Sequence, residues 1–380
     1  MEAMEKISAH VGTRLQDLQQ MRKKGQKIVG YIPNGYMPEE LVYACGAVPV
    51  PLNRGGDPEP VAISASYLGR FMDPFCRAQI GYRVLKEEPL YQMLDLLVVP
   101  VTDIHIRAIA DSWDFFTDVE VYRLGVPHMK TNHGLRYYSE GLELLKERLQ
   151  KLTGVEITEK NLHKEIEGAN RRRTLLRNLS LTRKTEPSPL RGRDFIRLLH
   201  QSFLADRTFL AEILESLAVE FRGLQALHSG GPRILLTGST LAQGDYKVVD
   251  LLEEAGASIV MEEFSEGLRE YWQNVGTEGD GIRALAEAYF AQKIPGAFFR
   301  GVMRERFNFL STLTRDFKVD AVVWYSLLYR ECYDVEGALF RKELEKLNIP
   351  LLQISSDYDP VEAGALRTRI ETFVETLRRN

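Results

Sequence analysis

The sequence predicts an α/β protein with two Rossmann-like parallel-sheet domains joined by a helical connector. Short apolar runs rich in β-branched residues occur in two groups of four, and helical patterns follow them. Between the groups, from about residue 135 to residue 230, the strand signal vanishes. A chain of 380 residues also exceeds what one hydrophobic core usually organises, which favours two core-forming domains.

The first group of runs predicts an α/β domain over residues 25–134. Its strands are expected at residues 27–32, 47–52, 95–101 and 119–124. An amphipathic, charged N-terminal segment, residues 1–24, precedes it and predicts a helix over about residues 3–24. We expect this helix to pack across one of the domains or against a partner.

The middle of the chain predicts a helical connector over residues 135–230. Charged amphipathic patterns at 139–152 and 161–177 are typical of helices, and a loop containing Pro187, Pro189 and Gly192 interrupts them. Strand signals resume in residues 231–380, which predict the second α/β domain. Its strands are expected at residues 233–237, 257–261, 320–325 and 349–354.

Composition excludes several classes of function. The chain is 44% hydrophobic and 27% charged with a net charge of −4, and its basic and acidic residues are interspersed, so no nucleic-acid footprint is present. No apolar run approaches the roughly 18 residues that a membrane helix needs, and no signal-peptide pattern begins the chain. Three widely spaced cysteines form no disulfide framework. We therefore expect a cytoplasmic protein without a membrane or nucleic-acid partner.

Ligands of open parallel sheets collect outside the carboxyl ends of the strands, so the residues that follow each predicted strand are site candidates. These residues include Tyr36, the segment 102–105, the loop at Gly238 and Ser239, and Ser326. The Gly238 loop is able to offer backbone N–H groups to an anion or to a carbonyl oxygen. Its spacing matches neither a Walker A motif nor a dinucleotide fingerprint, which argues against nucleotide binding.

Segments along nearly the whole chain carry a resemblance to a known family. They are Gly30 to Gly46, Asp73 to Gly81, Asp95 to Arg107, Gly154 to Thr158 with Asn170, Ile234 to Gly238, Lys247 to Gly256, Asn348 to Pro350, Ser356 to Tyr358 and Arg367 to Phe373. In order and spacing, the chain resembles a subunit of the 2-hydroxyacyl-CoA dehydratase and benzoyl-CoA reductase family, of the type called the D-component of 2-hydroxyglutaryl-CoA dehydratase.

The resemblance implies a function and partners. In such enzymes two related subunits form a heterodimer, and each typically binds a 4Fe-4S cluster through three cysteines. An ATP-dependent activator protein supplies a low-potential electron, and a CoA thioester is reduced or dehydrated in anaerobic metabolism. A related homodimeric branch carries a double-cubane cluster and reduces small molecules.

Two of the three positions that match the family's cluster ligands hold aspartate. Asp73 stands where a Cys-Pro is usual, Asp103 stands in place of the cysteine of Thr-Cys-Asp, and Cys332 alone matches the third ligand. Asp73, Asp103 and Cys332 form a candidate mixed-ligand site for a cluster or for a harder metal ion. Cys76 is a further candidate ligand, because it lies three residues after Asp73 and shares its helix face. The third alternative is a pocket without metal that serves binding or partner contact.

Several polar residues are candidates for roles around the thioester, each with a structural alternative. His105, two residues beyond Asp103, is a candidate proton shuttle or a satisfied polar residue. Tyr36 and Ser326 are candidates for approaching the thioester oxygen, although aromatic packing explains the tyrosine equally well. Arg77 and Arg107 are candidates for binding the phosphates of coenzyme A, or they occupy helix surfaces.

The sequence thus leaves three hypotheses open. The leading one is a subunit of an ATP-activated, iron-sulfur dependent acyl-CoA dehydratase or reductase. The second is a cluster-free subunit that binds a CoA thioester or acts as a scaffold. The third, a homodimeric double-cubane reductase, is disfavoured because such a cluster needs more thiolates than the substituted pocket offers.

Overall fold

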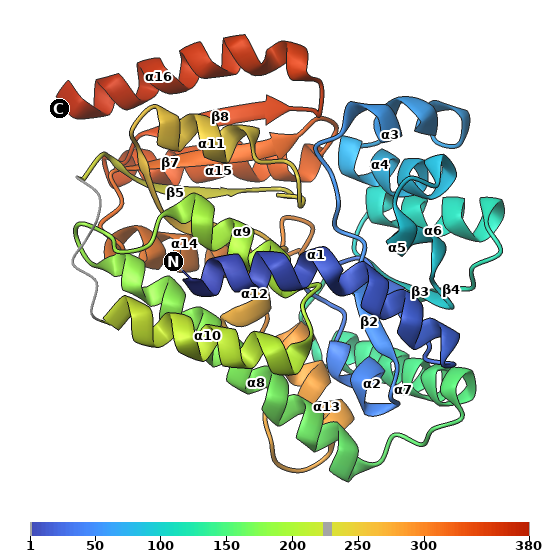
Figure 1. Cartoon of the computed structure of the whole chain (residues 1–380). Coiled ribbons are helices and arrows are strands. Elements are labelled where there is room, and N and C mark those ends of the chain that lie inside the picture. Colours follow the sequence, from blue (N-terminus) through green and yellow to red (C-terminus); the bar gives the residue numbers. More distant parts are fainter. Residues whose placement is uncertain (1, 223–229, 380) are drawn as a thin grey trace.

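The computed structural model describes residues 2–222 and 230–379, and it contains two four-stranded sheets in which every strand pair is parallel (Figure 1). This arrangement confirms the predicted class, two Rossmann-like sheets with helices between them. The predicted connector, residues 135–230, includes residues 223–229 near its end, and these lie outside the described residues. The domain boundaries stay predictions.

The first sheet has the strand order β2-β1-β3-β4. Its strands are β1 (Ile28–Tyr31), β2 (Val48–Pro51), β3 (Leu96–Val101) and β4 (Val121–Gly125), each within two residues of its predicted start. Side chains along β3 alternate between two buried clusters, with Leu97 and Val99 on one face and Leu96 and Val98 on the other. Burial on both faces explains why the sequence of this strand is continuously apolar.

Helices cover both faces of this sheet. They are α2 (Glu39–Ala44), α3 (Pro58–Ile63), α4 (Pro74–Leu85), α5 (Pro89–Gln92), α6 (Ile104–Phe116) and α7 (Asn132–Thr153), with a 3₁₀ turn η1 at Ser64–Ser66. The side chains of α4 and α6 belong to one buried cluster and those of α2 and α7 to the other. The helices α4 and α6 also contact each other, and the aspartates at their N-termini, Asp73 and Asp103, both contact Arg330.

The second sheet has the order β6-β5-β7-β8. Its strands are β5 (Arg233–Gly238), β6 (Ser258–Glu263), β7 (Ala321–Leu327) and β8 (Leu351–Ser356). The helices of this half of the chain are α11 (Lys247–Glu254), α12 (Leu268–Tyr271), α13 (Gly281–Ala286), α14 (Met303–Asp316), α15 (Glu331–Lys346) and α16 (Ala363–Arg379), with a π-helical turn η3 at Glu287–Ala291 and a 3₁₀ turn η4 at Pro360–Glu362.

The connector consists of helices that pack on one another. They are the last part of α7, then α8 (Glu159–Leu181), the 3₁₀ turn η2 (Thr182–Lys184), α9 (Gly192–Ser202) and α10 (Arg207–Arg222). The N-terminal helix α1 (Glu2–Lys23) lies across α9 and α10 (Figure 1). Its Leu18 belongs to the same buried cluster as Ile28 of β1. The helix therefore ties the connector to the first sheet.

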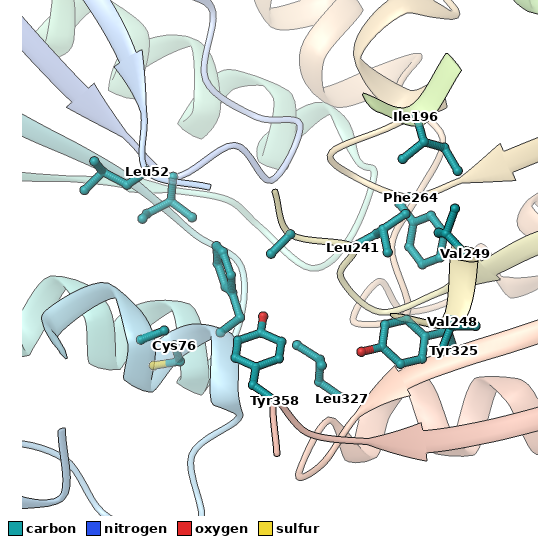
Figure 2. Close-up of a cluster of buried hydrophobic side chains, with 14 of the residues drawn as sticks. Leu52, Cys76, Ile196, Leu241, Val248, Val249, Phe264, Tyr325, Leu327 and Tyr358 are labelled. Carbon is teal, nitrogen blue, oxygen red and sulfur yellow. The ribbon is translucent and has the colours of Figure 1, made fainter. Parts of the chain in front are cut away.

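One segment of the C-terminal half packs on the first domain, which the sequence pattern did not predict. Val275, Ile282 and Phe290 share a buried cluster with Val29 and Tyr138. A second link appears in Figure 2, where Tyr358, in the loop after β8, lies close to the helix that carries Cys76, and both belong to one buried cluster with Leu327 of β7. The two domains thus share buried apolar contacts in two separate clusters. No helix among the described residues is long and apolar enough to cross a membrane.

Candidate functional site

The candidate site lies where the carboxyl ends of the two sheets face each other. Asp73 precedes α4, Asp103 follows β3, and Arg330 follows β7 in the other domain. Asp73 and Arg330 have exposed fractions of 1% and 4%, so this polar group is largely withdrawn from water. The structure thus brings Asp73 and Asp103 to one place, as the strand-end rule and the resemblance both predicted.

Both aspartates are helix N-caps. The Oδ1 of Asp73 accepts a hydrogen bond from the backbone N–H of Cys76 at 2.8 Å. The Oδ1 of Asp103 accepts from the N–H groups of His105 at 2.9 Å and Ile106 at 3.2 Å. These N–H groups have no partner within their own helices, and the helix dipole favours negative charge there, so both carboxylates suit their positions.

Arg330 lies between the two carboxylates. Its Nη1 donates to Asp103 Oδ1 at 3.0 Å and to Asp73 Oδ2 at 3.4 Å. Tyr329, with φ = 69°, adopts the left-handed conformation that carries the chain from β7 into α15, and Arg330 is the N-cap of α15. Its guanidinium also packs over the ring of Tyr333, 5.1 Å from the centroid. The cation is therefore held from three sides.

The charges of this group depend on one another. Burial by itself lowers the pKa of Arg330, but Asp103 and Asp73 outweigh it and raise that pKa well above its ordinary value. Burial by itself raises the pKa of Asp103, yet Arg330 and the N–H of Ile106 lower it overall. Arg330 and Asp103 therefore carry charge at neutral pH, and the contacts of Arg330 with Asp73 and Asp103 form a buried ionic cluster that joins the two domains.

His105 and Cys76 stand beside this ion pair, and their polar atoms already have partners. His105 Nδ1 accepts from the N–H of Asp73 at 3.2 Å, and its Nε2 lies 3.6 Å from Glu331 Oε2. The Cys76 thiol donates to the carbonyl oxygen of His105 at 2.8 Å. Burial, with the negative charges of Asp73 and Asp103, raises the pKa of Cys76 well above its ordinary value. Its thiol is therefore protonated.

The donor set does not fit an iron-sulfur cluster of the three-thiolate type. Cys332, the second residue of α15, is the one thiol at a family ligand position, and burial raises its pKa to about 11. Asp73 and Asp103 direct their oxygens to Arg330 and to helix N–H groups. Within residues 2–222 and 230–379, no three His, Cys, Asp or Glu side chains are grouped so that they could hold a metal ion. A guanidinium occupies the space between the two aspartates.

A small cleft opens in front of Arg330. Asn34 and Thr102 line it from the first domain, and Ser239, Thr240 and Glu266 line it from the second. Burial raises the pKa of Glu266 to about 7, so that this carboxyl is protonated in a large fraction of molecules at neutral pH. A larger hollow, lined by Arg233 and others, lies at the amino ends of β5 and β6, away from these residues.

The remaining predicted residues of the strand ends occupy different positions. Ser239 lines the cleft, and Gly238 precedes it with φ = 148°. A Cβ on Gly238 would lie 1.7 Å from the carbonyl oxygen of Tyr325, so glycine allows β5 and β7 to approach there. The hydroxyl of Tyr36 is buried without a partner among the described residues, and its ring packs against Phe298. Ser326 is fully buried.

The two candidate phosphate-binding arginines make other contacts. Arg77 donates from Nη2 to the carbonyl oxygen of Val61 at 2.8 Å and from Nε to Ser64 Oγ at 3.0 Å. Arg107 lies on the surface of α6 and pairs with Asp111 at 3.3 Å. These contacts match the structural alternative for both residues.

Sequence reasoning missed Arg330 and Glu266. Arg330 follows a predicted strand and so met the strand-end rule, but the nearby Cys332 carried the family's ligand position and was preferred. Glu266 lies three residues after the end of β6, in a loop that holds no family ligand position. The signal that could have found both residues is a charged side chain shortly after the end of a predicted strand.

Comparison with known proteins relates the chain to one family. A family model described as 2-hydroxyglutaryl-CoA dehydratase, D-component, matches residues 34–377. The chain is 28% identical to a putative dehydratase subunit of Escherichia coli over 94% of its own length and 93% of the relative. It is 21% identical to the (R)-phenyllactyl-CoA dehydratase beta subunit of Clostridium sporogenes, with 95% and 94% covered. It is 20% identical to a subunit of the benzoyl-CoA reductase of Thauera aromatica, with 93% and 91% covered.

Proposed function

The chain belongs to the 2-hydroxyglutaryl-CoA dehydratase D-component family, and from this premise we propose that it is the cluster-free subunit of an acyl-CoA dehydratase or reductase assembly. In this proposal the chain binds or supports a CoA thioester, and a sibling subunit of the same family carries the iron-sulfur chemistry. An ATP-dependent activator protein delivers the electron to that sibling in the cytoplasm.

The observation that carries this proposal is the position of Arg330. A cationic guanidinium contacts both Asp73 and Asp103 at the positions that match the family's cluster cysteines, which supports a pocket without a cluster. Asp73 has an exposed fraction of 1%, and breaking a buried pair of this kind costs about 3–5 kcal/mol. Loading a cluster would require that cost, in addition to removing a proton from the Cys332 thiol.

The names of the relatives support the assembly. They include the beta subunit of one enzyme and a subunit of a reductase, and the match extends over more than nine-tenths of each of these chains. A protein that keeps this whole length has kept both sheets and the cleft between them. We infer that it also acts beside a second subunit.

The leading alternative retains iron in this chain, with Asp73, Asp103 and Cys332 as mixed ligands. It requires Arg330 to leave both carboxylates. Glu266, another buried acid of the cleft, is a poor substitute partner, because burial raises its pKa to about 7 and reduces its negative charge. The homodimeric double-cubane alternative needs still more thiolates than the two cysteines near the site provide.

The test is turnover with the assembled components. Anaerobic mixtures of this chain, its sibling subunit and the ATP-dependent activator are assayed with aromatic and 2-hydroxyacyl thioesters. We expect ATP-dependent turnover that requires this chain and that persists when this chain carries Cys332→Ala. No turnover from the complete mixture would contradict the assembly, and loss of turnover with Cys332→Ala would contradict the cluster-free role.

A further inference from the structure

The hollow at the amino ends of β5 and β6 is separate from the candidate site. The strand β5 has six residues, so about 20 Å of extended chain separates Arg233, at its start, from Ser239 in the cleft. The volume of the hollow is about 260 Å³, and one buried water needs roughly 10–15 Å³, so a ligand of many heavy atoms has room there. Charged side chains line it, namely Glu186, Arg191, Arg193, Arg233, Glu253 and Glu254.

Arg233 is a buried cation in the wall of this hollow. Its exposed fraction is 5%. Its guanidinium donates to the carbonyl oxygens of Phe317 at 2.9 Å, Arg183 at 2.8 Å and Thr185 at 3.3 Å. A guanidinium has five N–H groups, so two are left beyond these three contacts.

The charge of Arg233 is not matched by these contacts. Carbonyl oxygens have no net charge, and within the part of the chain that the structure describes no carboxylate lies in ion-pair contact with this guanidinium. Burial lowers the pKa of Arg233 below its ordinary value, and the more distant charges of Glu186 and Asp320 do not offset that effect. A buried cation without a counter-charge is costly, and a bound anion would remove the cost.

A structural role explains part of this arrangement. Phe317 is the C-cap of α14 and Thr185 is the C-cap of η2, so Arg233 joins the ends of two helical segments to the start of β5. Cations are favoured at helix C-termini. This role uses three of the five N–H groups and does not require that the side chain also line a hollow of this volume.

The start of α9 adds positive potential to the same hollow. Arg193 is the second residue of α9, and the N-cap of this helix makes no side-chain hydrogen bond to it. Glu253 accepts from the backbone N–H of Arg193 at 3.1 Å and pairs with its side chain at 3.5 Å. The other N–H groups of the first turn have no partner within their own helix, and the helix dipole is positive at this end.

The glutamates of the hollow already have cations. Glu253 pairs with Arg193, Glu254 pairs with Arg367 at 2.9 Å, and Glu186 pairs with Lys318 at 3.8 Å. The carboxylates are thus matched while Arg233 is not, so the imbalance favours an anionic ligand. Arginine binds phosphate oxygens through two N–H groups at once, and helix N-termini bind phosphate as well.

We propose that this hollow binds a phosphate-type oxyanion, carried by a diphosphate or by a phosphate ester. Arg233 and Arg193 are the cationic contacts, and the first N–H groups of α9 lie beside them. The proposal is independent of the proposed function, because the hollow lies at the opposite end of the second sheet from the candidate site. Success or failure of turnover therefore leaves it unchanged.

The test is direct binding to the purified full chain. Calorimetry at constant ionic strength compares pyrophosphate, ADP and acetate, so that general screening by salt is the same for each. Pyrophosphate and ADP should bind at least tenfold more tightly than acetate, because each oxygen of a diphosphate can accept from a charged donor. Tighter binding of ADP than of pyrophosphate would identify a phosphate ester, and equal binding would identify the diphosphate alone. Absence of pyrophosphate and ADP binding at millimolar concentration, or acetate binding of equal strength, would overturn the proposal.

A matched pair of variants on α9 connects the binding to the hollow. Arg193→Gln should lower the affinity for pyrophosphate about tenfold, the value of one hydrogen bond to a charged group. Arg197→Gln is the control, because Arg197 lies one turn further along the same helix and pairs with Asp250 at 2.9 Å. Both variants remove one positive charge from α9. Equal losses of affinity would show general attraction to charge and would overturn the site.

Arg233→Lys tests the buried cation. Lysine keeps the charge but lacks the planar fork of N–H groups, so the affinity for pyrophosphate should again fall about tenfold. Thermal unfolding shows whether this variant is folded. A folded Arg233→Lys protein with unchanged affinity would exclude Arg233 from the site, and the two α9 variants decide the proposal if Arg233→Lys does not fold.

Discussion

Arg330 stabilises the site because two buried carboxylates share its charge. Arg330→Ala leaves Asp73 and Asp103 close to each other without a cation between them. We expect the free energy of unfolding to fall by about 3–5 kcal/mol, the cost of breaking a buried pair by removing one partner. Urea denaturation of the variant and the wild type measures this difference.

The matched control for that variant is Arg107→Ala. The Arg107 side chain is 68% exposed and pairs with Asp111 on the surface of α6. An exposed pair contributes about 0–1 kcal/mol, so the control should change stability far less. Equal losses for the two arginine variants would show that burial between the carboxylates is not what matters at Arg330.

Glu266 makes stability depend on pH in a defined direction. Burial raises its pKa from 4.5 in the unfolded chain to about 7 in the folded protein, so the folded state holds the proton more tightly. The free energy of unfolding is therefore highest, as far as Glu266 is concerned, below pH 4.5. It falls as the pH rises from 4.5 through about 7, because the unfolded chain releases this proton at a lower pH than the folded protein does. Glu266→Gln should remove this loss and make the protein more stable than the wild type at pH 8, by up to about 3 kcal/mol.

Urea denaturation at pH 5 and pH 8 measures that effect. The difference between Glu266→Gln and the wild type should be small at pH 5 and larger at pH 8. Glu87→Gln, at an exposed position, should show no such change. A Glu266→Gln difference that does not vary with pH would contradict the assignment of a raised pKa to the cleft carboxyl.

At the scale of elements, the turn after β5 depends on glycine. Gly238 has φ = 148°, and a Cβ there would meet the carbonyl oxygen of Tyr325 at 1.7 Å, so β5 and β7 would have to separate. Gly238→Ala should lower the free energy of unfolding by more than about 2 kcal/mol.

The control for the glycine prediction is Gly12→Ala in α1. A Cβ at Gly12 would meet nothing within 4 Å, and alanine is the better helix former. This variant should be as stable as the wild type or more stable by up to about 1 kcal/mol. Thermal melts of the two variants compare them directly, and a Gly238→Ala protein as stable as the Gly12→Ala protein would contradict the close approach of β5 and β7.

The sequence predicted a central strand such as β3 well because it is buried on both faces. Leu97 and Val99 face one cluster while Leu96 and Val98 face the other, so no polar residue interrupts the run. The packing of Ile282 and Phe290 on the first domain could not be predicted in the same way. Short helices carry the same amphipathic signal whichever domain they cover, so the pattern does not name their partner.

The same contrast holds at the candidate site. The strand-end rule and the family resemblance together predicted that Asp73 and Asp103 would meet. The role of Arg330 needed the structure, because an arginine before a helix usually lies on the surface, and the left-handed conformation of Tyr329 that precedes Arg330 has no clear mark in the sequence.

For the whole molecule, the contacts of Arg330 with Asp73 and Asp103 bear on both the packing of the two domains and the proposed function. Arg330 from the second domain joins the N-caps of two helices of the first, where the family resemblance would place a cluster between the same elements. The cation contacts carboxylates of the first domain and so helps to keep the domains together. We therefore propose that the Arg330 guanidinium stands in this chain where the family resemblance implies a metal cluster.

Iron and acid-labile sulfide, with the electronic absorption spectrum, test that claim most directly. The chain is expressed without its sibling and purified without oxygen, beside the Cys332→Ala variant. We expect neither protein to hold iron or sulfide at cluster stoichiometry, and both to have the same spectrum and fold. Iron and sulfide at cluster stoichiometry in the wild type, lost in Cys332→Ala, would contradict the claim and assign the site to a mixed-ligand cluster.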